Sequence, residues 1–135
     1  MKIEIPPLAE QQQAIIARET QKAMQQLEVN LAAPVIESAL DIDETQYNHD
    51  HLLDKPRWQA PHKDIVSAYF KQFQSHFPAY GSDAKLATLL GLSSDRRVRE
   101  YKSGARKINY ETWRRFLVVT GRAPQQVLPV LAYMR

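Results

Sequence analysis

The stretch LATLLGLSSDRRVREYKSGARK, Leu86–Lys107, decides how the chain folds. Its apolar residues recur at helical spacing up to Gly91, which predicts a short helix closed by a glycine. These apolar residues are Leu86, Ala87, Leu89 and Leu90. A second short helix is expected from about Ser94 to Ser103, closed by Gly104. Two short helices joined by a turn that contains glycine are typical of a helix-turn-helix.

The residues before this pair also predict a helix. Between about His62 and Phe77, apolar residues fall on one helical face, and Ser82 or Asp83 is a candidate N-cap for the helix that follows. The apolar face consists of Ile65, Val66, Tyr69, Phe70 and Phe73.

Two more helices are expected after the pair. Asn109 can cap a helix that ends at Gly121, and residues 123–134 are expected to form a last, mostly apolar helix. The inward residues of the first of these are Trp113, Phe116, Leu117 and Thr120. With no convincing strand, the predicted fold class is all-α: a compact five-helix helix-turn-helix domain with an N-terminal helical extension.

The first 60 residues are expected to form that extension. Leu8 to Leu31 contains no Gly or Pro, is rich in good helix formers and carries a narrow apolar stripe. Ala33–Leu40 is a candidate short helix. Asp41–Asp64 is polar and contains two prolines, so it is interpreted as a connection and as the domain boundary. The predicted domains are therefore residues 1–60 and 61–135.

Charge is divided unevenly between these two parts. Residues 1–60 carry 5 Lys/Arg and 10 Asp/Glu, a net charge of −5, whereas residues 61–135 carry 13 and 5, a net charge of +8. A locally basic domain attracts polyanions such as nucleic acid. The sequence has no cysteine, which excludes disulfides and thiolate metal sites. It shows no secretory signal and no membrane-spanning apolar stretch, so a cytoplasmic protein is expected.

The predicted helix Ser94–Ser103 carries its charges opposite its apolar residues. At about 100° per residue, Val98 and Tyr101 lie together and would pack on the preceding helix, while Arg96 points away. Arginine can donate two hydrogen bonds to guanine O6 and N7 in the major groove. The residues expected to face the bases are Arg96, Arg97, Arg99, Glu100 and Ser103. Those expected to hold backbone phosphates are Ser93, Ser94, Lys102, Arg106 and Lys107.

The plain alternative for this helix is a solvated basic face, on which Arg96 and Glu100 form an ion pair at i,i+4 spacing. Such a face usually mixes charges of both signs, whereas this one is strongly positive and directly follows a helix and turn. These two features favour the nucleic-acid interpretation.

The spacing of the marker residues resembles the Cro and phage-repressor helix-turn-helix family, often called XRE-type. Its pattern is a Leu-Ala pair, a turn Gly, a β-branched residue, an aromatic residue, a second Gly and basic residues. The matching positions are Leu86-Ala87, Gly91, Val98, Tyr101, Gly104 and Arg106-Lys107. The following NYETWRRFLVVTGRAP is similar to the family's fourth helix, so the resemblance covers about residues 62–133. It implies that residues 94–103 form the recognition helix. The turn LSSD is expected to be one residue longer than is usual in the family.

Together these features predict a sequence-specific DNA-binding transcriptional regulator, a repressor of bacterial or phage type. It would bind double-stranded DNA as a homodimer and block polymerase sterically. The apolar stripe of Leu8–Leu31 fits a dimer seam, and equally fits packing against its own domain. The acidic segment could instead bind another protein or screen the basic face. The alternative function is a non-enzymatic protein-interaction module on the same fold, antitoxin-like or a phage protein that binds a host factor.

Other kinds of site find little support in the sequence. In NHDH, Asn48–His51, the two histidines are two residues apart and share no helix face, and DIDE, Asp41–Glu44, lacks the glycine and distal Glu of a calcium loop. The chain has no nucleophile motif and no Gly-rich phosphate loop. We therefore expect no enzyme activity, no metal and no cofactor, and no small-molecule effector is evident.

Overall fold

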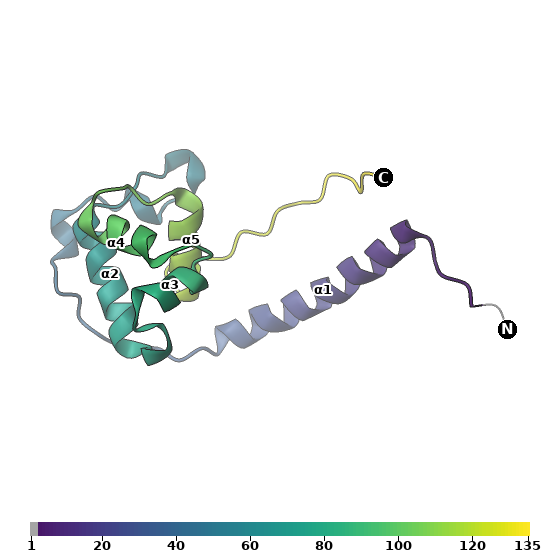
Figure 1. Ribbon diagram of the computed structural model, residues 1–135, viewed down its shortest axis with the longest axis horizontal. Helices are drawn as coiled ribbons and strands as arrows, with labels where there is room; N and C mark the ends of the chain where they lie inside the picture. The colour runs from purple at the N-terminus through teal and green to yellow at the C-terminus, as the bar shows by residue number, and fades with distance from the viewer. Residues whose placement is uncertain (1–2) are drawn as a thin grey trace. The chain divides into compact units, whose positions relative to one another are not determined.

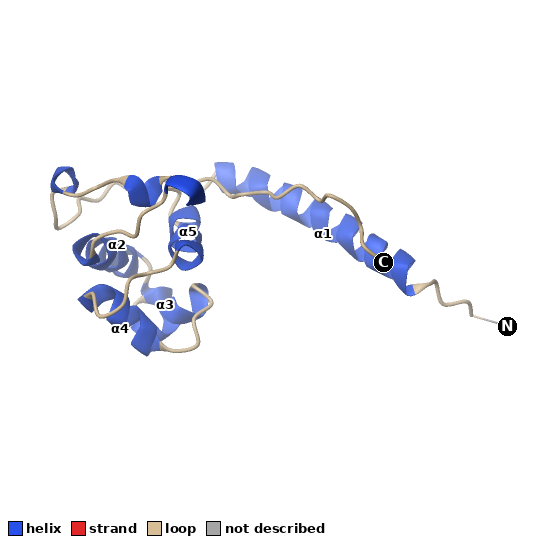
Figure 2. Ribbon diagram, turned by 90° about the horizontal axis from the view of Figure 1, so that it is seen from above, coloured by secondary structure: helices blue, strands red, loops and turns tan. Residues whose placement is uncertain are grey.

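The computed structural model describes residues 3–135, and the regular structure of these residues is entirely helical (Figures 1 and 2). The α-helices are α1 Leu8–Leu31, α2 Lys63–His76, α3 Asp83–Leu89, α4 Asp95–Ser103 and α5 Tyr110–Val119. The short 3-10 helices are η1 Glu44–Gln46, η2 Asp50–Leu52, η3 Lys55–Arg57 and η4 Pro78–Tyr80. The predicted all-α fold class is thus confirmed over the described residues. The chain divides into two units: residues 3–37 with Leu128–Arg135, and Ser38–Val127.

The core of the Ser38–Val127 unit is built on aromatic residues of α2 and α5. The predicted apolar face of α2 is buried, and Trp113, Phe116 and Leu117 of α5 are 0% exposed. The ring centroid of Phe116 lies 4.9 Å from that of Phe70 and 5.4 Å from that of Trp113. Helices α3 and α4 add the buried residues Leu86, Ala87, Val98 and Tyr101, and the turn between them adds Leu90. Burial of large apolar side chains is the main force that holds these helices together.

Side-chain caps and glycines set the helix ends where the sequence predicts them. Ser82 Oγ accepts a hydrogen bond from the backbone N–H three residues on at 3.2 Å, and Asn109 Oδ1 does the same at 2.8 Å. Gly91 and Gly121 follow α3 and α5 with φ of 73° and 71°. Glycine enters this left-handed region without the penalty that a Cβ would impose, so these residues stop the helices.

The segment 38–60 belongs to the helical unit, which corrects the predicted division at residue 60. His51, in η2, is 1% exposed, and its Nδ1 accepts a hydrogen bond from Trp113 Nε1 at 3.1 Å. The apolar residues of this segment that pack on the core are Leu40, Ile42, Tyr47 and Trp58. Three-residue 3-10 helices have no 3.6-residue period, so the segment looks like a polar connection in the sequence.

Two predicted helices do not form. Residues 33–40 and 124–135 have no helical structure. Pro129 would fall in the interior of the expected last helix, where proline removes a hydrogen bond and clashes with the preceding turn. An eight-residue helix over 33–40 would have no buried face to stabilise it, since residues 33–39 are exposed. The helical unit therefore contains the four α-helices α2–α5 instead of five.

Helix α1 forms as predicted, and none of its residues is buried. Ile16 and Leu27 are both 39% exposed, and Met24 is 53% exposed. The apolar residues of this stripe are therefore partly exposed.

We expect the free energy of unfolding of the Ser38–Val127 unit to fall as the pH drops from 6.5 to about 4. Burial lowers the pKa of His51 from 6.5 to about 4. Between pH 6.5 and 4 the unfolded chain binds a proton at His51 that the folded protein excludes. The stability that comes from keeping His51 neutral is therefore fully present above pH 6.5 and is lost progressively as the pH falls to about 4. One pKa unit corresponds to about 1.4 kcal/mol, which makes the loss at most roughly 3.5 kcal/mol.

Urea denaturation across this pH range measures the effect. The His51→Asn variant is expected to be less stable at neutral pH and to show a flatter dependence of stability on pH. An equal slope in the wild type and the variant would assign the pH dependence to other groups.

Candidate nucleic-acid interface

Helices α3 and α4 form the predicted pair of short helices and are joined by the turn at residues 90–94. Val98 is 0% and Tyr101 is 3% exposed, so α4 rests on the core through the two residues predicted to anchor it. In the turn, the Leu92 N–H donates to Ala87 O at 2.9 Å, which closes α3. Two exposed hydroxyl residues then precede α4: Ser93 and Ser94.

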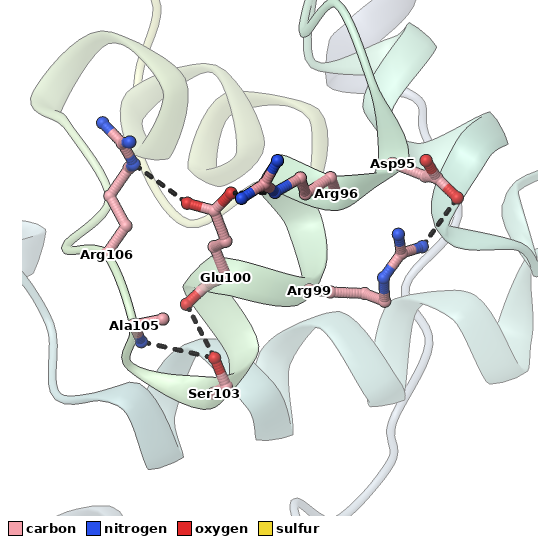
Figure 3. Close-up of polar contacts among 7 residues, drawn as sticks. All are labelled: Asp95, Arg96, Arg99, Glu100, Ser103, Ala105 and Arg106. Atoms are coloured by element: carbon pink, nitrogen blue, oxygen red, sulfur yellow. Dashed lines mark hydrogen bonds and ion pairs between the residues drawn. The ribbon is translucent and has the colours of Figure 1, made fainter.

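Charged side chains on the outer face of α4 are paired with one another (Figure 3). Arg99 donates a hydrogen bond to Asp95 at 2.6 Å. Glu100 accepts a hydrogen bond from Arg106 Nε at 3.0 Å and forms an ion pair with Arg96, whose Nε lies 3.2 Å away. The side chain of Glu100 is only 20% exposed. The carboxylates of Asp95 and Glu100 partly neutralise the arginines, so this face is less positive than the number of its basic residues alone would suggest.

These carboxylates are held in their charged form. The hydrogen bond from Arg99 lowers the pKa of Asp95, and the hydrogen bond from Arg106 lowers the pKa of Glu100. Arg96 and Arg99 nevertheless remain 81% and 57% exposed. Water screens ion pairs that are this exposed, so they add little stability and can be exchanged for other acceptors.

Ser103 closes α4. Its Oγ donates to Glu100 O at 3.2 Å and accepts from the Ala105 N–H at 3.3 Å (Figure 3). Gly104 follows with a φ of 82°, which turns the chain away from the helix axis. Ser103 is exposed, but its hydroxyl already serves the end of the helix.

Lys102 points to the inner side of α4 and fastens the helix to its neighbours. Its Nζ donates to Asp83 Oδ1 of α3 at 2.6 Å and to Gln74 Oε1 of α2 at 2.9 Å. Partial burial raises the pKa of Asp83, but the hydrogen bonds from Lys102 and Gln74 outweigh it and leave the pKa below its ordinary value. Lys102 was expected to contact a phosphate, but its ammonium group is already bonded to Asp83 and Gln74 within the protein.

Arg97 and Lys107 complete the predicted set. Arg97 is half-exposed and Lys107 is exposed, and neither forms an ion pair or a side-chain hydrogen bond within residues 3–135. The structure thus joins Arg96, Glu100 and Arg106 in one ion-pair network and pairs Arg99 separately with Asp95. It leaves the cationic groups of Arg97 and Lys107 outside that network.

Sequence reasoning missed the residues that hold the pair of helices in place. Gln74 and Asp83 bind Lys102, and Arg115 Nε of α5 donates to Leu89 O at 2.7 Å. The last contact supplies a donor to a carbonyl at the end of α3, which has no partner within the helix. The partners in these contacts are 19 to 28 residues apart in the sequence, so no local sequence pattern predicts them.

The histidines of NHDH serve local structure. His51 is buried against Trp113, and His49 Nε2 lies 2.9 Å from Glu44 O. Within the described part of the chain, no cluster of three or more His, Cys, Asp or Glu residues is placed to hold a metal ion. None of the helices described here combines the length and apolar character needed to cross a membrane.

Comparison with known proteins gave no match: no family model, no curated protein and no solved structure matches this chain. The resemblance to the Cro and phage-repressor family therefore stays a prediction from the spacing of its residues.

Substitution of two lysines separates the structural positions from the solvent-exposed ones. We expect Lys102→Gln to lower the free energy of unfolding by about 1 kcal/mol, because Asp83 loses its charged partner. Lys107→Gln is expected to change it by less than about 0.5 kcal/mol, since Lys107 touches no partner. Chemical denaturation at one pH measures both. Equal effects would contradict the role assigned to Lys102.

Proposed function

We propose that the protein is a sequence-specific DNA-binding transcription regulator, a cytoplasmic repressor of bacterial or phage type, and that α4 reads the major groove. One observation supports this most: Val98 and Tyr101 hold α4 on the core, while Arg96 lies opposite them and Arg97 and Arg99 lie on the two flanks of the helix. An α-helix fits the major groove, and arginine discriminates guanine there through paired hydrogen bonds.

The ion pairs on α4 are compatible with this role. Arg99 is paired with Asp95 on its own helix and is 57% exposed, so little is lost when it turns to a base edge. Glu100 stays between Arg96 and Arg106 and can orient both. In this proposal Glu100 positions arginines as well as facing the bases.

Phosphate contacts are proposed at both ends of the reading helix. Ser93 and Ser94 lie exposed before α4, and Arg106 and Lys107 follow its end. Phosphate contacts of this kind fix the register of a protein on the duplex without reading sequence. Lys102 is omitted because of its bonds to Asp83 and Gln74.

We further propose that the repressor acts as a homodimer, with α1 as the contact between copies. Support comes from the open apolar stripe of α1, in which Ile16 and Leu27 are 39% exposed. Two copies would place two reading helices on half-sites about one turn of DNA apart. Occupation of such an operator would block polymerase sterically.

The paired charges on α4 also favour a second candidate, a protein-interaction module without enzyme activity. A face on which carboxylates alternate with arginines can match a charged protein surface. The acidic stretch at residues 41–54 could bind such a partner as well. The two candidates differ in their salt dependence, because only DNA binding releases the counterions of phosphates.

Selection of bound sequences from a random duplex pool tests the proposed function. We expect one enriched sequence with two-fold symmetry, which would also support the homodimer. A plot of the logarithm of its binding constant against the logarithm of the salt concentration should be steep, with a slope of about −0.9 for each phosphate contact. Failure to enrich any sequence, with a weak dependence on salt, would favour the protein-interaction module.

Point variants on the selected duplex test the roles of single residues. Arg99→Gln is expected to weaken specific binding about tenfold or more and to relax selectivity at one base pair. Lys107→Gln should weaken binding to specific and random duplexes alike and reduce the salt slope by about 1. Arg57→Gln, in η3, removes the same charge outside the proposed DNA and dimer surfaces and serves as the control. Unchanged selectivity in Arg99→Gln would contradict its place in the reading helix.

A further inference from the structure

A pocket of about 490 Å³ lies beside the C-terminal end of α4. Its walls come from three stretches: residues 46–51 with η2, residues 59–66 at the start of α2, and residues 101–108. The volume is in the range of small-molecule sites, roughly 300–1,000 Å³. Its apolar and aromatic lining residues include Tyr47 and Ala60, which are partly exposed, and Pro61, Val66, Tyr101 and Ile108, which are buried.

The charge of the pocket has one sign. Lys63, Arg106 and Lys107 line it, and none of its lining residues is Asp or Glu. Arg106 is paired with Glu100, but Lys63 and Lys107 are exposed and form no ion pair within the described chain. The aliphatic part of Lys63 lies against Gly104 at the end of α4. The contact is close: a Cβ at Gly104 would lie only 2.7 Å from Lys63 Cδ. Cationic side chains are thus placed over a partly apolar pocket.

His51, one of the lining residues, carries a buried hydrogen-bond donor that has no partner. The indole of Trp113 can only donate, so His51 Nδ1, 3.1 Å away, must accept. Burial lowers the pKa of His51 to about 4, so the ring is neutral at neutral pH and its single proton lies on Nε2. This Nε2 is buried without a hydrogen-bond partner, which is costly for a donor.

We propose that this pocket binds a small organic anion, a carboxylate or phosphate monoester with an apolar body. Lys63 and Lys107 would attract the anionic group, and the partly exposed Tyr47 and Ala60 would contact the apolar body. Such binding needs no DNA, so it can be measured whether or not the proposed function holds.

Nuclear magnetic resonance of the full chain labelled with ¹⁵N tests the proposal. The probes are phenyl phosphate, benzoate and inorganic phosphate. With the first two, at millimolar concentration, we expect saturable shifts of the Trp113 indole N–H and of the Gly104 and Ile108 amides. Amides of α1 should not move. Phenyl phosphate should bind more tightly than inorganic phosphate, because only the ester can contact the apolar wall.

A pair of matched double variants tests the cationic rim. Lys63→Gln with Lys107→Gln is expected to weaken phenyl phosphate binding about tenfold or more, since charged hydrogen bonds are lost. Lys22→Gln with Lys85→Gln removes the same charge outside the pocket and should leave binding unchanged. All four lysines are exposed, so both proteins should fold.

Three results would overturn the proposal. The first is no saturable shift with either organic probe. The second is equal affinity for phenyl phosphate and inorganic phosphate, which would make the rim a contact for DNA phosphates alone. The third is equal weakening in the two double variants, which would reflect net charge and not this pocket.

Discussion

The rest of the structure depends on the burial of Trp113 with its indole N–H satisfied. The ring is 0% exposed, and its centroid lies 5.5 Å from that of Tyr69 and 5.4 Å from that of Phe116. Such a donor is costly to bury without an acceptor, and His51 Nδ1 provides one at 3.1 Å. The segment that carries His51 must therefore lie against α5. The Trp58 indole, which donates to His51 O at 3.1 Å, secures the same turn.

This core explains how a short helix can be held firmly enough to present a surface. α4 has only nine residues and would not be stable alone. Val98 and Tyr101 bury its inner side, and Lys102 links it to Asp83 and Gln74. Burial distinguishes the two kinds of cation on this helix. The Lys102 side chain is 26% exposed and fastens the helix, whereas the Arg96 side chain is 81% exposed and can change partners.

Much of the helical fold could be predicted because local physics shapes it. The faces of α2 and α5 followed from the spacing of their apolar residues, and Gly91, Gly121, Ser82 and Asn109 marked the helix ends. The predictions failed where no period was present. The stretch 38–60 docks through 3-10 turns, and the apolar composition of 123–134 suggested a helix that Pro129 opposes.

For the candidate site, the sequence by itself determined which helix carries the arginines and which residues, Val98 and Tyr101, anchor it. The helical period settles both, since it depends only on neighbours along the chain. Only the tertiary structure decided that Lys102 is engaged with Asp83 and Gln74, that Ser103 ends the helix, and that a basic pocket adjoins it. These features join residues far apart in sequence, and their partners are set by how the helices pack.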